Sequence, residues 1–346
     1  MRYLFVLILL SILWLECCKP ADSADAPDVS DIEVDFNLIR YDQALFQLDA
    51  NNVDSGFEKL NTTYPEFTDL YFKKLTNFHH PNKDSFMLVI SNFLKDENIQ
   101  KLQNNIEEKF SNFNSIEKDL KQACQYLKYY FPEREIPVFY TLNSEFGYQS
   151  FIFEEQGRDG IGIGLDLFLG EDFNYKSVDP RNPAFSDYLV RTYNDEHIVK
   201  KTMEALVKDM IGEPAGKRFL DIMINNGKKL FVLDKILPQT SDTVIIEYKK
   251  EDWEWVNENE LEIWSFFLEK KMTYETNYLK INKYLNPSPN SPGMPAQAPG
   301  KTANFIGWKI VSAFMKRNPE VSLQELIDLK DSQQLLEKAK YKPKRR

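Results

Sequence analysis

Two adjacent thiols near the start of the chain, Cys17 and Cys18, are the side chains whose position points most directly to chemistry. They follow an apolar run from Tyr3 to Leu15, and Arg2 places a positive charge before that run. A helix of this length would span only about 20 Å, too short for a bilayer, so the segment is typical of a secretory signal peptide. A cysteine where the run stops predicts a bacterial lipoprotein signal, in which the thiol is acylated, with palmitate among the expected acyl groups.

The residues before each cysteine decide which of the two we expect to be acylated. Such sites have leucine three positions before the cysteine and small residues between them. Cys18 has Leu15 at that position, although Glu16 is not small, whereas Cys17 has Trp14. We therefore expect lipid on Cys18, with Cys17 as the alternative and an uncleaved N-terminal anchor as a further one. Residues 1–18 are then the signal segment, 19–31 a flexible tether, and 32–340 a single domain.

The composition of the rest of the chain narrows the class of protein. A net charge of −10 argues against nucleic acid as a partner. Once Cys18 is acylated only Cys124 keeps a free thiol, so the exported body must be stabilised by its core and not by a disulfide. The basic tail is predicted to be a solvated helix end, with attraction to an anionic membrane or polymer as the alternative; its residues are Lys338, Lys340, Lys342, Lys344, Arg345 and Arg346.

Few other side chains are spaced for catalysis. The adjacent pair His79–His80 cannot share one helical face, and His197 stands alone, so we expect no zinc site and no cofactor. Residues 160–164 read Gly-Ile-Gly-Ile-Gly but continue into a strand-like segment, which argues against a nucleotide loop. We interpret them as an edge strand whose glycines allow another backbone to approach. Glu258, Glu260 and Glu262 are predicted to form the exposed face of a helix.

Hydrophobic periodicity predicts an α+β fold, predominantly helical, with a small mixed β-sheet packed on helices. The part from 32 to 135 is predicted to begin with a short strand at 32–36 and to be helical after it. A small sheet is predicted at about 137–170. Residues 183–340 return to helices, expected at 184–193, 196–211, 217–236, 250–270 and 303–317, with a last one after Ser322. The loop 286–300 contains five prolines, which exclude a helix and leave either an ordered irregular loop or a flexible lid.

The order of small sheet, glycine-bearing strand and two helices resembles the layout of zincin metallopeptidases. In that family the first helix carries His-Glu-x-x-His and the second often carries an acidic ligand. The matching positions here are Met203, Glu204, Val207 and Asn226, so only the general base of the motif is retained. Because Met is a poor zinc ligand and Val is none, the resemblance implies a zincin-like scaffold whose metal site has been lost.

A second resemblance covers nearly the whole chain after the tether. It is carried by residues 34–46 (VDFNLIRYDQALF), 220–242 (LDIMINNGKKLFVLDKILPQTSD) and 253–264 (WEWVNENELEIW). The most specific segment is 291–319, where a loop rich in proline and glycine runs into a helix containing Gly307. A glycine inside a helix predicts close packing against a neighbour. In these segments the sequence resembles the gliding-motility lipoprotein GldB family of the Bacteroidota.

This resemblance implies a lipid-anchored component of the gliding machinery, linked to the envelope apparatus that also secretes adhesins, and it implies no established catalytic activity. We expect a non-enzymatic docking subunit that faces the periplasm, whose partners are other gliding proteins and, through its lipid, a membrane. The expected docking surfaces are the cleft of the lost zincin-type metal site and the loop 286–301. The loop residues expected to take part are Asn286, Pro289, Gly293, Gly300 and Lys301. The alternatives are an envelope hydrolase with Glu204 as general base and, third, a periplasmic chaperone or peptidoglycan-binding module.

Overall fold

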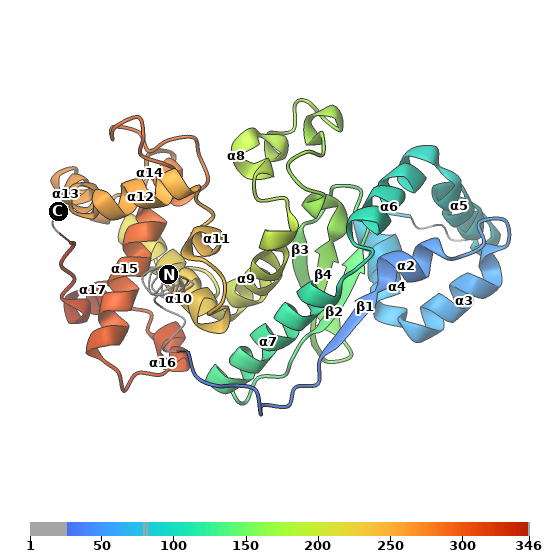
Figure 1. Ribbon diagram of the computed structural model, residues 1–346, viewed down its shortest axis with the longest axis horizontal. Helices are drawn as coiled ribbons and strands as arrows, with labels where there is room; N and C mark the ends of the chain where they lie inside the picture. The colour runs from blue at the N-terminus through green and yellow to red at the C-terminus, as the bar shows by residue number, and fades with distance from the viewer. Residues whose placement is uncertain (1–25, 79, 81, 345–346) are drawn as a thin grey trace, which may run out of the picture.

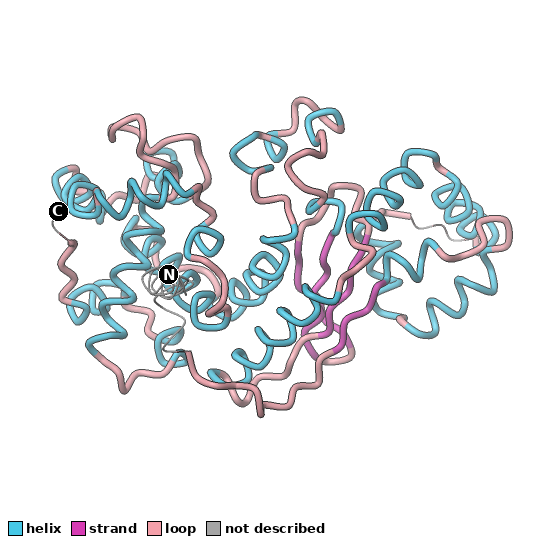
Figure 2. The backbone as a smooth tube through the Cα atoms, viewed as in Figure 1, coloured by secondary structure: helices cyan, strands magenta, loops and turns pink. Residues whose placement is uncertain are grey.

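The computed structural model describes residues 26–78, 80 and 82–344. A small β-sheet stands at its centre, with one group of helices formed by the N-terminal part on one side and a larger group formed by the C-terminal part on the other (Figure 1). Figure 2 shows the same division, with the strands in magenta between two helical regions. The predicted α+β class, predominantly helical with a small mixed sheet, is confirmed.

The sheet has four strands in the order β1-β2-β4-β3. These are β1 (Asn37–Arg40), β2 (Val138–Leu142), β3 (Ser150–Glu155) and β4 (Arg158–Gly164). β2 pairs in parallel with β1 and β4, whereas β3 pairs antiparallel with β4. The sheet therefore takes one strand from the N-terminal part of the chain, and that strand begins at Asn37, after the segment 32–36 where we expected it.

The strand with three glycines, β4, is internal, so the prediction of an edge strand is wrong. Its glycines are needed because aromatic rings of the neighbouring strand lie over them. A Cβ atom added to Gly160 or Gly162 would come within 2.4 or 2.3 Å of the ring of Phe153 or Phe151. After Gly164 the chain forms the 3-10 turn η3 (Leu165–Phe168) and does not continue as a strand.

Helices cover both faces of the sheet. Val138, Tyr140 and Leu142 point into a core rich in aromatic residues that is formed with the N-terminal helices. These helices are α2 (Tyr41–Phe46), α3 (Val53–Thr63), α4 (Pro65–Leu70) with the π-turn η2 (Tyr71–Leu75), and α5 (Lys83–Lys95). Phe139, Ile161 and Ile163 point into the larger core on the other face.

The larger core joins α6 (Glu97–Lys109) and α7 (Asn114–Tyr130) to the C-terminal helices. Those are α9 (Ile198–Ile211), α10 (Phe219–Ile236), α11 (Asp242–Ile246), α12 (Lys250–Glu258), α13 (Glu260–Glu269), α14 (Tyr278–Leu285), α15 (Thr302–Arg317), α16 (Leu323–Asp328) and α17 (Ser332–Ala339), with the 3-10 turn η7 (Met272–Tyr274). Cys124 is fully buried in this core, and burial raises the pKa of its thiol.

Two glycines allow α10 and α15 to approach each other closely. A Cβ added to Gly227 would lie 2.3 Å from the carbonyl carbon of Gly307, and one added to Gly307 would lie 2.1 Å from the carbonyl oxygen of Met223. The predicted close packing at Gly307 is confirmed. The predicted capping box is also present, because Ser322 and Glu325 bond each other's backbone amides at the start of α16.

Two predicted helices are interrupted. The segment 250–270 divides at Asn259 into α12 and α13, and Glu260 at the start of α13 is buried, so the prediction that it lies on an exposed face is wrong. The segment 184–193 contains the 3-10 turn η5 (Pro183–Phe185) and the short helix α8 (Asp187–Val190), separated by the extended residue Ser186. Two further 3-10 turns, η4 (Tyr175–Ser177) and η6 (Asp195–His197), flank this segment.

Residues 170–193 form an arm that projects from the body at α8 (Figure 1). Its residues Tyr175, Phe185 and Tyr193 form a small core together with Leu167 of η3. Hydrogen bonds reinforce it, since the hydroxyl of Tyr193 donates to the carbonyl oxygen of Ala184 at 2.9 Å. The arm is therefore a packed unit that can hold side chains in place opposite the C-terminal helices.

Candidate functional site

The expected lipid-attachment residues, Cys17 and Cys18, lie outside the described residues. The described chain begins at Ala26, within the predicted tether, and Val29 already lies in the large core with 4% of its surface exposed. The amide of Gln125 then donates to the carbonyl oxygen of Ile32 at 3.0 Å. The body thus holds the chain from Val29 onward, close to where any tether must end.

The positions that match the zincin motif lie on α9 and α10. Met203 and Val207 are fully buried and belong to the large core, where they face other apolar residues. Asn226 lies on α10, and its amide donates to the side-chain oxygen of Asn304 on α15 at 3.0 Å. Among the described residues no group of three or more His, Cys, Asp and Glu side chains is placed to hold a metal ion.

Glu204 lies on another side of α9 and takes part in ion pairs. Its carboxylate is 2.9 Å from the ammonium group of Lys200 and 3.2 Å from that of Lys208, one helical turn before and after it. Lys200 extends these contacts inward, because its ammonium group is also 2.6 Å from the carboxylate of Glu247. Glu204 is therefore the outer member of a larger group of charges.

Glu247 is the centre of that group, which we term the Glu247 cluster: Lys200, Lys201, Glu204, Glu247 and Lys301. The Glu247 carboxylate contacts three ammonium groups, those of Lys200 at 2.6 Å, Lys201 at 2.5 Å and Lys301 at 3.0 Å. Its backbone has the left-handed conformation (φ 62°) at the end of α11, which turns the side chain toward α9 and the start of α15. The cluster therefore ties together three elements that are far apart in the sequence.

Burial and charge act in opposite directions on the pKa values of this cluster. Burial alone would raise the pKa of Glu247, but its three lysine neighbours outweigh that effect and hold the pKa well below its ordinary value. For Lys301 burial is the stronger effect, and it lowers the pKa to about 8 despite the attraction of Glu247. Nearby, burial lowers the pKa of His197 to about 4, and its Nδ1 lies 2.7 Å from the side-chain oxygen of Asn194.

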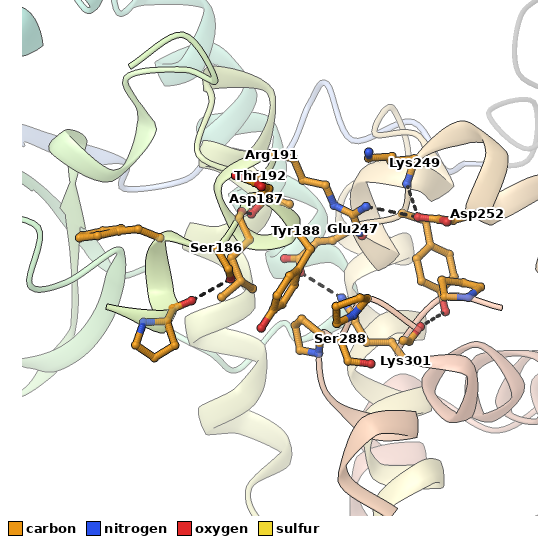
Figure 3. Close-up of a pocket in the computed structure, with 18 of the residues that line it drawn as sticks. Ser186, Asp187, Tyr188, Arg191, Thr192, Glu247, Lys249, Asp252, Ser288 and Lys301 are labelled. Atoms are coloured by element: carbon orange, nitrogen blue, oxygen red, sulfur yellow. Dashed lines mark hydrogen bonds and ion pairs between the residues drawn. The ribbon is translucent and has the colours of Figure 1, made fainter. Parts of the chain in front are cut away.

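Two members of the Glu247 cluster, Glu247 and Lys301, line a cleft of about 670 Å³. One wall is the arm, with Arg181, Tyr188 and Arg191, and the other is made by residues 247–252 and by the loop 286–301 (Figure 3). Arg191 reaches across the cleft, because its guanidinium donates to the backbone oxygen of Glu247 at 2.9 Å and to the carboxylate of Asp252 at 3.2 Å.

Cationic side chains outnumber carboxylates in the cleft. Three pairs are closed within the protein: Lys176 with Asp187 at 2.6 Å, Arg191 with Asp252 at 3.2 Å and Lys301 with Glu247 at 3.0 Å. Arg181 and Lys249 also line the cleft and are exposed, and neither side chain is ion-paired within the described part of the chain. The cleft can therefore receive anionic groups from another molecule at these two residues.

The loop 286–301 contributes only part of its expected docking residues to the cleft. Pro289, Gly300 and Lys301 line it, whereas Asn286 and Gly293 do not. The amide of Asn286 donates to the hydroxyl of Tyr278 at 2.7 Å, and Gly293 lies against the ring of Phe266.

Internal hydrogen bonds hold this loop. The amide and the hydroxyl of Ser291 donate to the carbonyl oxygens of Ala298 at 3.0 Å and Pro299 at 2.6 Å. The hydroxyl of Tyr248 donates to the carbonyl oxygen of Gly300 at 2.7 Å. The loop is an ordered irregular structure, which is one of the two possibilities that the sequence left open.

By its fold and its cleft, the chain is a predominantly helical α+β protein with a small mixed sheet and a charged cleft. No curated protein and no solved structure matches the chain. A family model described as "Gliding motility protein GldB" matches residues 22–343. The chain therefore belongs to the gliding motility protein GldB family, which confirms that resemblance, and it is involved in gliding motility.

The match to the family model also indicates where in the cell the protein is located. The family is designated as one of lipoproteins, which supports attachment of the chain to a membrane of the cell envelope. Within the residues that the structure describes, no helix has both the length and the apolar character that crossing a membrane requires.

Proposed function

We propose that this protein is a lipid-anchored, non-enzymatic docking subunit of the gliding machinery, with a zincin-like scaffold. The observation that carries the proposal is the environment of Glu204, the residue that matches a general base. Burial would raise its pKa, but Lys200 and Lys208 outweigh burial and lower the pKa below its ordinary value. A general base works best when its pKa is close to the ambient pH, so this carboxylate is a weak proton acceptor. Its neighbours Met203 and Val207 serve packing, which fits a scaffold role.

The cleft is the docking surface in this proposal. Its walls are a packed arm and an ordered loop, so its shape is present before a partner arrives, which lowers the entropic cost of binding. Arg181 and Lys249 are exposed on these walls and suit carboxylates of a partner protein in the gliding machinery.

The test is complementation of a gliding strain that lacks its own copy of the gene. Glu204→Gln keeps the shape of the side chain and removes the base, and we expect normal gliding. The double variant Arg181→Glu, Lys249→Glu reverses the two cleft charges, and we expect gliding to be lost while the protein stays folded and anchored. Lys59→Glu with Lys74→Glu is the matched control, because these exposed lysines belong to the N-terminal helices.

Each outcome bears on one part of the proposal. Loss of gliding in Glu204→Gln at normal protein level would support the hydrolase alternative. Normal gliding in the Arg181, Lys249 double variant would remove the cleft as the docking surface. Recovery of a gliding protein by crosslinking to the wild type but not to the double variant is the expected biochemical counterpart.

Anchoring is tested separately. We expect Cys18→Ser to abolish incorporation of a palmitate analogue and to release the protein from membranes, whereas Cys17→Ser keeps both. The opposite result assigns the lipid to Cys17. Protection from protease in whole cells, lost when the outer membrane is opened, is the result expected for a body that faces the periplasm.

A further inference from the structure

α15 and α17 lie side by side at one end of the molecule (Figure 1), and six cationic residues stand at the C-terminal end of one of these helices or shortly after it. We term them the basic patch: Lys316, Arg317, Lys338, Lys340, Lys342 and Lys344. All six are exposed. Five of them line one shallow pocket, together with Ala313 and Asn318, and no carboxylate lines it. On a chain with a net charge of −10, this surface is a local excess of positive charge.

The C-terminal tail is held against the body, so the backbone that carries Lys342 and Lys344 has a fixed position. Lys340 has the left-handed conformation (φ 45°) and ends α17. The hydroxyl of Tyr341 then donates to the carboxylate of Glu260 at 2.9 Å, and the backbone amide of Lys344 donates to the same oxygen at 3.3 Å. The ring of Tyr341 also packs edge-on against Trp264. The backbone of residues 341–344 is thus held against the body beyond the end of α17, whereas the side chains of Lys342 and Lys344 are exposed, as predicted for a solvated helix end.

The basic patch has no ion pair within the described residues. The carboxylate that holds the tail, Glu260, has only 3% of its surface exposed and already accepts the two bonds from the tail. Fixed like charges repel one another, and the repulsion is relieved when anionic groups from another molecule approach. The surface therefore suits contact with the anionic groups of another molecule.

The first described residue places the expected tether beside this surface. Ala26, Met315 and Lys316 line one groove, and Lys316 also belongs to the basic patch. The segment from Cys18 to Asp25 is eight residues long and can span at most about 28 Å. A lipid on Cys18 would therefore keep Ala26, and with it the groove beside the basic patch, within about 28 Å of the bilayer.

We infer that the basic patch binds the anionic phospholipid headgroups of the membrane that holds the lipid anchor. The nearness to that membrane rests on the proposed lipidation, whereas the binding chemistry of the patch does not. A lipid and a cluster of basic residues act as two membrane signals, and each basic side chain near an anionic surface strengthens binding about fivefold. The body would then lie with α15 and α17 toward the bilayer and the cleft free for a partner.

The experiment uses the chain from Lys19 onward, made without the signal segment and therefore without lipid. Its binding is measured by flotation with vesicles of phosphatidylcholine alone and with vesicles that also contain phosphatidylglycerol. We expect binding to the anionic vesicles only, reversed by added salt. The triple variant Lys316→Gln, Lys338→Gln, Lys342→Gln should bind about 100-fold more weakly.

The matched control is Lys59→Gln, Lys74→Gln, Lys95→Gln, which removes three exposed lysines from the N-terminal helices at the opposite end of the molecule (Figure 1). We expect it to bind anionic vesicles like the wild type. Equal loss in both triple variants would reduce the effect to net charge and overturn the inference. So would binding to soluble polyglutamate with none to vesicles, or the absence of binding to either vesicle.

The inference and the proposed anchor can fail independently. Failure of palmitate labelling at Cys18 and Cys17 would remove the lipid anchor and leave the vesicle result intact. Failure of the vesicle experiment would leave a lipid anchor without a second contact at α15 and α17.

Discussion

The Glu247 cluster and the basic patch are both groups of charges dominated by lysine, but they differ in how those charges are matched. In the Glu247 cluster the ammonium groups of three lysines contact one carboxylate, and the side chains are mostly buried. In the basic patch six exposed cations have no ion pair within the described residues, and the neighbouring carboxylate is used to hold the tail. The first arrangement pairs its charges inside the protein, whereas the second presents them to solvent.

This difference separates a structural role from a binding role. Removing the one carboxylate that a buried group of lysines shares leaves them desolvated and without that partner, which is strongly destabilising. Removing an exposed and unpaired charge changes stability little but changes attraction to a charged partner. The two regions should therefore respond in opposite ways in measurements of stability and of binding.

The largest expected effect is on the Glu247 cluster. Glu247→Gln keeps the size of the side chain but leaves Lys200, Lys201 and Lys301 without their shared carboxylate. We expect a loss of about 3 to 5 kcal/mol in the free energy of unfolding, measured by urea denaturation. The control is Glu254→Gln on α12, whose pair with Lys250 is exposed and 3.9 Å long, and which should change stability by less than about 0.5 kcal/mol.

A small effect of Glu247→Gln would contradict the comparison. It would mean that the three lysines are hydrated or find other partners, so that the Glu247 cluster resembles the basic patch. Glu247→Gln combined with Lys301→Met sharpens the test, since removal of one cation together with the anion should restore part of the lost stability.

The next effect concerns pH and His197. Burial lowers its folded-state pKa from 6.5 to about 4, so between these values the unfolded chain binds more protons than the folded one. Stability should therefore fall as the pH decreases from about 6.5 to about 4, by up to about 3 kcal/mol. Urea denaturation at several pH values measures this loss.

The variant His197→Gln isolates this contribution. It should show a flatter dependence between pH 6.5 and 5, a range in which the lysine neighbours of Glu247, by lowering its pKa, keep that carboxylate ionised in the folded state. If the variant and the wild type have the same slope over this range, His197 does not titrate as its burial indicates, and the loss belongs to other groups.

The sequence predicts the elements that depend on neighbouring residues. The helices around 196–211, 217–236 and 303–317 are predictable because their apolar side chains recur at helical spacing, and the structure has them at Ile198–Ile211, Phe219–Ile236 and Thr302–Arg317. The position of β4 within the sheet is not predictable in this way. It depends on Phe151 and Phe153 covering its glycines from β3, while β2 pairs along its other side.

The site is predictable only in part for a similar reason. Glu204 is identified by its place in a motif. Its ion-pair partner Lys200 also contacts Glu247, and Glu247 comes from a distant segment of the sequence. The sequence around Glu247 contains no motif that marks it. Its backbone conformation is left-handed although the residue is not glycine, so the sequence does not indicate that conformation. Lys301 is recognisable as a loop residue, and only the fold shows that it is buried against Glu247. Such convergence comes from tertiary packing and leaves no local pattern.

The smallest expected effect is on the stability of the basic patch, and it completes the comparison. The triple variant Lys316→Gln, Lys338→Gln, Lys342→Gln removes three exposed side chains that have no ion pair within the described residues. Its free energy of unfolding at low salt should stay within about 0.5 kcal/mol of the wild type, because nothing inside the protein loses a partner. Any change should be toward higher stability, since like charges are removed, and it should vanish in high salt. A loss of more than about 1 kcal/mol would show that these lysines stabilise the fold as the Glu247 cluster does, and their effect on vesicle binding would then have to be separated from unfolding.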